Sequence, residues 1–265
     1  MNDLRNDGIV LIGAGNLAVN LAHALGGKGY RILQIYDRNQ KAGKWLARRT
    51  GAAFTGDLSS ITKDAGIIFL AVSDDAIGTL AERICPANSL VVHCSGTTGI
   101  DIFKGLFQNY GVFNPVQTFL KTRPVSMKKA PFCIEANHVE NERILTELAL
   151  TLEGKPYLLT SEQRMTVHLC SVLTSNFTNW LNSIAEDILS KKGIPFEILL
   201  PLISRTIKNA EKGNISGSQT GPAIREDYEV IRKHLELLAT NSEYHEIYEK
   251  ITASIVKYKL SHGKL

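Results

Sequence analysis

The stretch Gly8-Ile-Val-Leu-Ile-Gly13-Ala-Gly15-Asn-Leu-Ala18 decides the fold of this chain. Its apolar run leads directly into the pattern GxGxxA, and residues 19–25 follow with helical character before two glycines. This order predicts a strand, a tight turn and a helix. Gly13 permits the turn, Gly15 lets the backbone approach a pyrophosphate, and Ala18 lets the helix pack closely on the strand.

The start of that helix, at Asn16 and Leu17, is expected to bind the phosphates of a dinucleotide through unpaired backbone N–H groups and the helix dipole. A second expected strand, residues 31–36, ends at Asp37, where an acid accepts a hydrogen bond from a ribose hydroxyl. Glycine pairs also occur in purely structural turns, but the acid in its expected place favours a dinucleotide site.

Arg38 bears on which dinucleotide is bound. Asp37 as a ribose acceptor favours NAD, whereas Arg38 can stack on adenine or pair with a 2′-phosphate, which favours NADP. The alternative is that Arg38 is a solvated loop residue without a role in binding. We expect NADP as the cofactor, with NAD as the alternative.

The composition of the 265 residues, 44% of them hydrophobic, fits two modest domains better than one large core. The net charge of +4 is small and the two signs are mixed, so we expect neither nucleic acid nor a membrane as partner. A polar N-terminus and the lack of long apolar runs lead us to expect a cytoplasmic protein. The cysteines lack metal-binding spacing and sit in apolar segments, which predicts buried thiols and no metal site: Cys85, Cys94, Cys133 and Cys170.

Expected strands and helices alternate as far as residue 160. The run 67–72 is wholly apolar, which is typical of a parallel strand covered on both faces, and another strand is expected at 89–94. Open α/β sheets bind ligands at the carboxyl ends of their strands. Four residues at these ends are expected to line the cofactor site: Val72, Ser73, Ser95 and Gly96. His93 is either a proton donor or a packed structural histidine.

Beyond residue 160 the pattern is helical. Thr160 and Gln163 resemble a capping box, and a region without proline or glycine predicts one helix over residues 161–192, ended by Gly193. Polar residues recur along this helix at intervals of three or four and form one stripe: Arg164, His168, Ser171, Ser175 and Asn179. Apolar residues on its other faces, Met165, Leu169, Leu173 and Leu181 among them, predict that much of the helix is buried.

Further helices are expected at 195–212, 223–240 and 242–260. The fold class is therefore α/β. We expect a Rossmann-like doubly wound sheet that binds a dinucleotide in residues 1–160, and an all-helical domain in residues 161–265.

Four motifs follow the glycine-rich turn: Asn114-Pro-Val-Gln-Thr-Phe119, Arg164-x-x-x-His168, Ser175-Asn-Phe177 and Thr220-Gly-Pro-Ala-Ile-Arg-Glu-Asp227. Taken in this order, over essentially the whole chain, they resemble the NADP oxidoreductases that pair a Rossmann-like domain with a helical domain of unknown function. That family is similar to pyrroline-5-carboxylate reductases, ketopantoate reductases and 3-hydroxyisobutyrate dehydrogenases. The resemblance implies a nicotinamide-dependent reductase of a small molecule, with its active site between the domains and a homodimer built through the helical domain.

Two departures from these families bear on the mechanism. Ketopantoate reductases and 3-hydroxyisobutyrate dehydrogenases carry Lys-x-x-x-Asn where this chain has Arg164-x-x-x-His168, and arginine does not release a proton at neutral pH. The family's usual His-Pro is Asn114-Pro115 here. We therefore expect His168 to donate the proton and Arg164 to hold a substrate carboxylate. The alternative is that these two side chains form a buried structural brace.

Four further polar residues are expected to bind substrate: Asn114, Ser175, Asn176 and Asn209. For Asn176 and Asn209 the alternative is a brace between the helices. The leading interpretation is the reduction of a small, ketopantoate-like 2-oxo acid. A second is a dinucleotide-binding sensor without catalysis, which the missing Lys-x-x-x-Asn favours. A third is an imine reductase of the pyrroline-5-carboxylate type, which Arg164 disfavours because a cation repels an iminium.

Overall fold

The computed structural model describes residues 7–63, 65–213 and 215–262. These residues form two compact units, one up to Thr174 and the other from Ser175 onward. Helix α6 (Ser161–Ser171), at the expected start of the helical domain, belongs by its contacts to the first unit.

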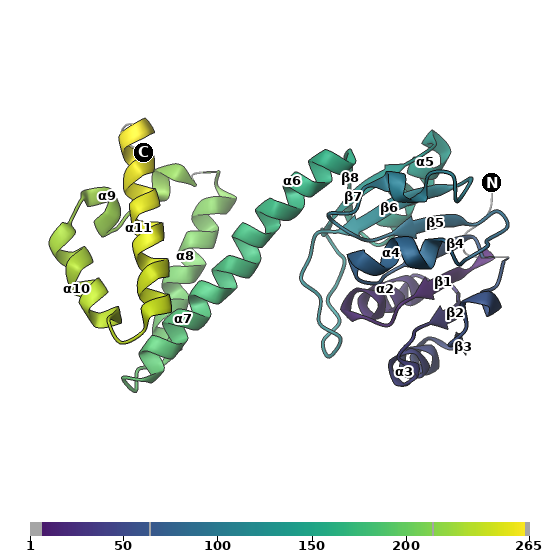
Figure 1. The fold of residues 1–265 in the computed structure, drawn as a ribbon, viewed down its shortest axis with the longest axis horizontal. Coiled ribbons are helices and arrows are strands. Elements are labelled where there is room, and N and C mark those ends of the chain that lie inside the picture. The colour runs from purple at the N-terminus through teal and green to yellow at the C-terminus, as the bar shows by residue number, and fades with distance from the viewer. Residues whose placement is uncertain (1–6, 64, 214, 263–265) are drawn as a thin grey trace. The chain divides into compact units, whose positions relative to one another are not determined.

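One sheet forms the centre of the first unit, and among the described residues it has eight strands (Figure 1). Their order is β3-β2-β1-β4-β5-β6-β7-β8, and every neighbouring pair is parallel except β6 and β7. The expected doubly wound sheet is confirmed, with one antiparallel step that the sequence pattern did not reveal. The strands are β1 (Ile9–Ile12), β2 (Ile32–Tyr36), β3 (Ala53–Thr55), β4 (Ile67–Leu70), β5 (Leu90–His93), β6 (Tyr110–Pro115), β7 (Pro131–Ala136) and β8 (Lys155–Leu158).

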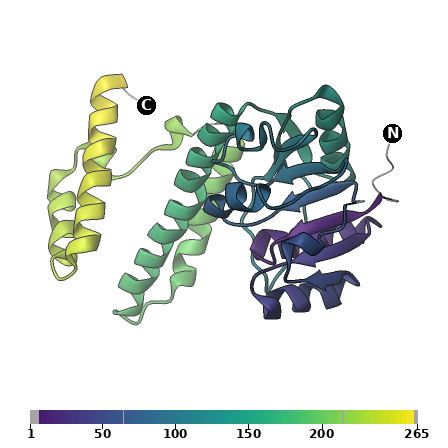
Figure 2. The ribbon, with the colours of Figure 1, turned by 45° about the vertical axis from the view of Figure 1, so that its right-hand side comes forward.

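Helices cover both faces of this sheet (Figure 2). Because successive side chains of a strand point to opposite faces, Ile9 and Leu11 of β1 join one hydrophobic cluster while Val10 and Ile12 join another. The first cluster includes side chains of α2 (Asn16–Gly27), α3 (Gln40–Thr50) and α5 (Val139–Thr151), and the second those of α4 (Asp74–Ala81). All four residues of β1 and of β4 are buried, which confirms the expectation for a sheet covered on both faces.

The second unit is helical. Its helices are α7 (Thr178–Ser190), α8 (Leu200–Glu211), α9 (Pro222–Arg225), α10 (Tyr228–Leu238) and α11 (Ser242–His262). The helix expected over residues 195–212 starts as a 3₁₀ turn, Phe196–Leu199. The helix expected over 223–240 is interrupted, because Glu226 adopts a left-handed conformation and Asp227 caps a new helix through the Val230 N–H.

The long helix expected over residues 161–192 forms with a change of pitch in its middle. The predicted capping box of Thr160 and Gln163 is present at its start. Between α6 and α7 the segment Val172–Phe177 is a π-helix, whose wider turn shifts the polar stripe out of register. Neither proline nor glycine marks this change, so the sequence pattern could not reveal it.

The expected burial of this helix is wrong for the single chain. Four of its large apolar side chains are 41–58% exposed: Met165, Leu169, Leu173 and Leu181. Among the described residues of α6 and α7, only Arg164 and Ile184 are buried. Two of the cysteines expected to be buried, Cys85 and Cys170, are also exposed, since one lies in the irregular segment between α4 and β5 and the other on the exposed side of α6. No described helix combines the length and apolar character needed to cross a membrane.

Candidate functional site

Parallel pairing brings the ends of four strands to one edge of the sheet. Ile12 at the end of β1 lies beside Tyr36 of β2 and Leu70 of β4, and Leu70 lies beside His93 of β5. The residues that follow these strand ends are the predicted cofactor ligands: Gly13, Gly15, Asn16, Leu17, Asp37, Arg38, Val72, Ser73, Ser95 and Gly96. Such an edge is where open α/β sheets bind their ligands.

The glycine turn has room for a phosphate at Gly15 and none for a side chain at Gly13. Gly13 has a φ of +114°, its N–H donates to Tyr36 O at 2.7 Å, and a Cβ there would lie 2.4 Å from Ala71 O. At Gly15 the same atom, Ala71 O, would lie 3.9 Å from a Cβ, which is ordinary contact. No side chain caps α2 and no acid lies in its first turn. The turn therefore fits the pyrophosphate of a dinucleotide.

Asp37 ties the end of β2 to the glycine turn. One carboxylate oxygen accepts the Ala14 N–H and the other the Asn39 N–H, each at 2.6 Å. Each oxygen keeps a lone pair for a ribose hydroxyl.

Arg38 is exposed and carries its charge toward α4. A hydrogen bond from Ser73, with a smaller effect of the Arg38 charge, lowers the pKa of Asp75 below its usual value. Asp75 in the first turn of α4 is thus one anion near Arg38. The Arg38 side chain is exposed and can also bind a second anion, such as a phosphate.

The turn after β5 is held by its own side chains. Ser95 Oγ accepts the N–H groups of Thr97 and Thr98 at 3.0 and 2.9 Å, and the Thr97 hydroxyl bonds to Asp74. Asn114, expected to bind substrate, donates to Cys94 O at 2.8 Å. The Asn114 amide thus braces the turn in which Gly96 lies.

His93 is a packed structural histidine. Its side chain is fully buried against Phe103, and its Nδ1 accepts the Ser95 N–H at 3.2 Å. Burial, helped by the positive charge of Arg164, lowers the pKa of His93 to about 3. The ring is therefore neutral at physiological pH, and the imidazolium form that would act as an acid is not populated.

Arg164 is fully buried and paired. Its guanidinium donates to Glu135 at 2.5 Å, to Thr98 O at 2.6 Å and to Ser161 Oγ at 3.2 Å. Ser161 in turn donates to Glu135 from its N–H and its hydroxyl, at 3.1 and 2.7 Å. We call Glu135, Ser161, Arg164 and the Thr98 carbonyl the Arg164 brace. It joins β7, the start of α6 and the turn after β5, all within the first unit. The brace left open by the sequence included His168, which is exposed and takes no part in this one.

Glu135 was not singled out from the sequence. It is the charged residue of a strand that otherwise reads Pro-Phe-Cys-Ile-Ala, and a charge in a half-buried strand needs a partner. That signal marks Glu135 as paired. It does not say that the partner lies 29 residues away.

His168 lies against Gly96, at the carboxyl edge of the sheet. It follows Arg164 by one helical turn, its side chain is exposed, and a Cβ added at Gly96 would lie 2.6 Å from its Nδ1. The structure thus brings the predicted proton donor into contact with a predicted cofactor-lining residue. The brace fixes the first turn of α6 and, through it, the position of His168.

Three expected substrate ligands belong to the second unit. Ser175 and Asn176 lie in the π-helical segment and Asn209 lies on α8. Their roles stay predictions.

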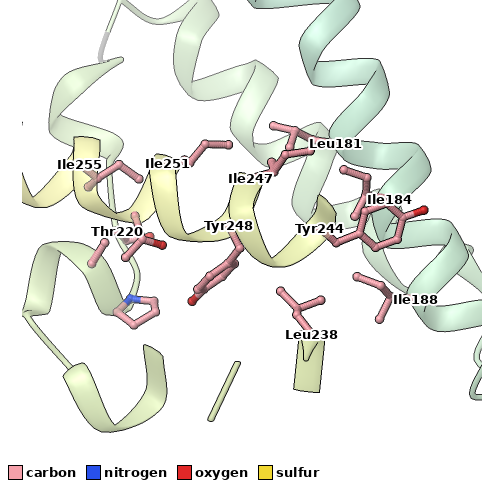
Figure 3. A pocket seen from close by; sticks show the side chains of 13 residues that line it. Leu181, Ile184, Ile188, Thr220, Leu238, Tyr244, Ile247, Tyr248, Ile251 and Ile255 are labelled. Atoms are coloured by element: carbon pink, nitrogen blue, oxygen red, sulfur yellow. The ribbon is translucent and has the colours of Figure 1, made fainter. Parts of the chain in front are cut away.

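The second unit also contains an apolar pocket of about 330 Å³ (Figure 3). Side chains of α7 and α11 line it, including Ile184, Ile247 and Ile251. Tyr248 from α11 also lines it, and its hydroxyl lies 2.7 Å from His234 Nδ1.

Comparison with protein families divides the chain in two. Residues 8–96 match the family described as NADP oxidoreductase, coenzyme F420-dependent. Residues 130–255 match a domain of unknown function, DUF2520. No curated protein matches the sequence significantly.

Solved structures show the same architecture. A Bacteroides fragilis protein assigned as an NADP oxidoreductase is 39% identical, with a TM-score of 0.90 over 96% of this chain and 100% of that one. A Thermotoga maritima protein is 24% identical, with a TM-score of 0.75 over 94% and 99%. An imine reductase from Myxococcus stipitatus in complex with NADP⁺ is 14% identical, with a TM-score of 0.69 over 97% and 95%, which shows a shared fold.

Proposed function

The chain belongs to the family of NADP oxidoreductases that join a Rossmann-like domain to DUF2520, and we propose that it transfers a hydride from NADPH to a small molecule with a C=N or C=O bond. The observation that carries this proposal is the contact of His168 with Gly96 at the carboxyl edge of the sheet. A reductase needs a titratable side chain beside its cofactor to supply a proton, whereas a protein that only binds the dinucleotide needs none.

NADPH supplies the hydride from C4 of its nicotinamide. A carbonyl oxygen needs a proton as the carbon receives the hydride, whereas a neutral imine nitrogen needs its proton beforehand, to become the iminium that accepts the hydride. His168 is exposed and next to Gly96, so its imidazole is the group placed to deliver that proton. The Arg164 brace holds α6 in position and does not touch the reacting atoms.

The pairing of Arg164 changes which substrate class is favoured. Because Glu135 neutralises Arg164 and both sit within a hydrogen-bonded brace, Arg164 has no free fork for a substrate carboxylate. For the same reason it no longer repels a cationic iminium. We therefore favour a small cyclic imine and keep a ketopantoate-like 2-oxo acid as the second candidate.

The first prediction concerns turnover. NADPH oxidation should occur with a member of a panel of cyclic imines and 2-oxo acids, and His168→Ala should lower kcat about 100-fold with little change in KM. His138→Ala is the matched control, because His138 follows β7 at the opposite edge of the sheet. Equal kcat values for the two variants would remove His168 from the mechanism. Tight NADPH binding without turnover of any panel member would favour the sensor.

We also propose that two chains form a homodimer through the helical domain. Large apolar side chains of the second unit stand exposed in the single chain: Phe177, Trp180, Ile198, Leu202, Ile207, Leu237 and Leu260. Apolar surface of this extent is typical of a protein interface.

We also propose the cytoplasmic location that the sequence predicts, where cysteines such as the four free ones of this chain stay reduced.

The second prediction tests this dimer. Sedimentation should give twice the 29.2 kDa chain mass, and Leu202→Glu should weaken association at least about tenfold, because it buries a charge in an apolar interface. Leu106→Glu, a substitution at a 44% exposed leucine of the first unit, is the control. A monomeric wild-type protein at micromolar concentration would contradict the proposal.

A further inference from the structure

A long loop joins β6 to β7, and residues 117–129 of it are here called the basic strap (Figure 1). Its ends are held by the core, since Phe119 packs against a hydrophobic cluster and Met127 is buried. Leu120, Lys121 and Arg123 between them are exposed.

The strap is fastened to α2 by two asparagines. Asn20 is fully buried, and its amide group donates to Leu120 O at 3.1 Å and accepts the Val125 N–H at 2.8 Å. Asn16, the first residue of α2, accepts the Lys121 N–H at 3.2 Å. The backbone of Lys121 therefore lies at the helix end that faces the glycine turn.

The opposite end of the strap follows α2 toward its C-terminus. Lys128 pairs with Glu153 at 3.3 Å, and Glu153 also pairs with Lys28, which directly follows α2. A helix of twelve residues is about 18 Å long. Lys121 and Lys128 thus mark the two ends of the same helix.

The strap accounts for the net positive charge of the chain. It contains four of the 30 lysines and arginines and none of the 26 acids, so the remaining residues are balanced at 26 of each sign. Lys128 is paired, whereas among the described residues the side chains of Lys121 and Arg123 have no hydrogen bond or ion pair. Two exposed cations in a strap whose backbone is bonded to the first turns of a helix with an uncapped N-terminus are suited to binding an anion.

We propose that Lys121 and Arg123 of the basic strap bind the pyrophosphate of NADPH together with the glycine turn. The inference rests on the proposed function, which supplies the dinucleotide. Leu120, Lys121 and Val125 of the strap bond to Asn16 and Asn20 in the first turns of α2, where the pyrophosphate is proposed to bind. The adenosine ribose is proposed to bind at Asp37, after β2. The pyrophosphate is common to NADPH and NADH.

The third prediction compares two double variants that each remove two charges from the same strap. Lys121→Gln/Arg123→Gln should raise the Kd of NADPH about 30-fold in a fluorescence titration, because two charge-assisted phosphate contacts are lost. It should raise the Kd of NADH by the same factor and flatten the salt dependence of binding. Lys128→Gln/Lys129→Gln is the matched control and should change either Kd less than about threefold. Thermal unfolding of all variants verifies that the fold is intact.

The outcomes separate the possible errors. A loss of affinity for NADPH alone would place the strap at the 2′-phosphate and overturn the pyrophosphate assignment. Equal effects of the two double variants would mean that the strap acts only through its overall charge, and this would overturn the proposal too. If wild-type protein binds neither dinucleotide, the proposed function itself fails, whereas tight wild-type binding with unaffected variants refutes the strap alone.

Discussion

Replacing Arg164 with alanine lowers the free energy of unfolding by about 3–5 kcal/mol, the loss expected when one partner of a buried ion pair is removed. The Arg164 side chain is fully buried and that of Glu135 is 18% exposed. After the substitution Glu135 keeps its bonds from Ser161 but loses its cation, and Thr98 O loses its donor. Because the brace sets the first turn of α6, kcat should fall together with stability.

Urea unfolding of Arg164→Ala and Arg232→Ala measures this effect. Arg232 is the control because its pair with Glu236 lies on the surface of α10, where such pairs contribute about 0.5 kcal/mol or less. Adding Glu135→Gln to Arg164→Ala should recover about 1 kcal/mol, since the amide leaves no unpaired charge. A loss below about 1 kcal/mol for Arg164→Ala would show that the brace is not what holds α6.

Replacing Gly15 with alanine weakens NADPH binding about 100-fold while the fold stays stable. A methyl group there has ordinary contact distances within the protein, 3.9 Å to Ala71 O, so the space it takes is the space for the pyrophosphate. Gly13→Ala should instead lower the free energy of unfolding. Its φ of +114° and the 2.4 Å approach to Ala71 O should cost about 3 kcal/mol of stability before any cofactor is added.

Fluorescence titration with NADPH and urea unfolding of both variants separate these effects. The account expects Gly15→Ala to unfold within about 1 kcal/mol of wild type and to bind poorly. Wild-type affinity in Gly15→Ala would mean that the pyrophosphate lies elsewhere, and the assignment of the cofactor edge would have to be abandoned.

The glycine turn and the sheet were predictable because their signals are local. A wholly apolar run such as residues 67–72 indicates a strand covered on both faces, and GxGxxA with Asp37 places the turn beside the end of β2. The spacing of Arg164 and His168 correctly placed both on one helix after the last strand. The family and its NADP-dependent oxidoreductase character followed from motifs that together span the chain.

The rest depended on contacts between distant residues. Arg164 was expected to hold a carboxylate, and the structure pairs it with one from the chain itself, on a strand 29 residues earlier. Asn20 is a polar residue among the apolar ones on the buried face of α2, and its partner on the strap lies 100 residues later, so no local pattern reveals its role. The exposure of the helical faces could not be read from periodicity, because an apolar stripe looks the same whether it faces a core or a second chain.

The most direct test of the central claim follows the hydride itself. NADPH with both C4 hydrogens replaced by deuterium is incubated with the wild-type protein and the panel of cyclic imines and 2-oxo acids, and the products are analysed by mass spectrometry. We predict one deuterium on the reduced carbon of one substrate class, with the yield sharply lowered by His168→Ala. Tight binding of the labelled NADPH without transfer of deuterium to any panel member would contradict the proposed reductase and leave a protein that binds the dinucleotide without using it.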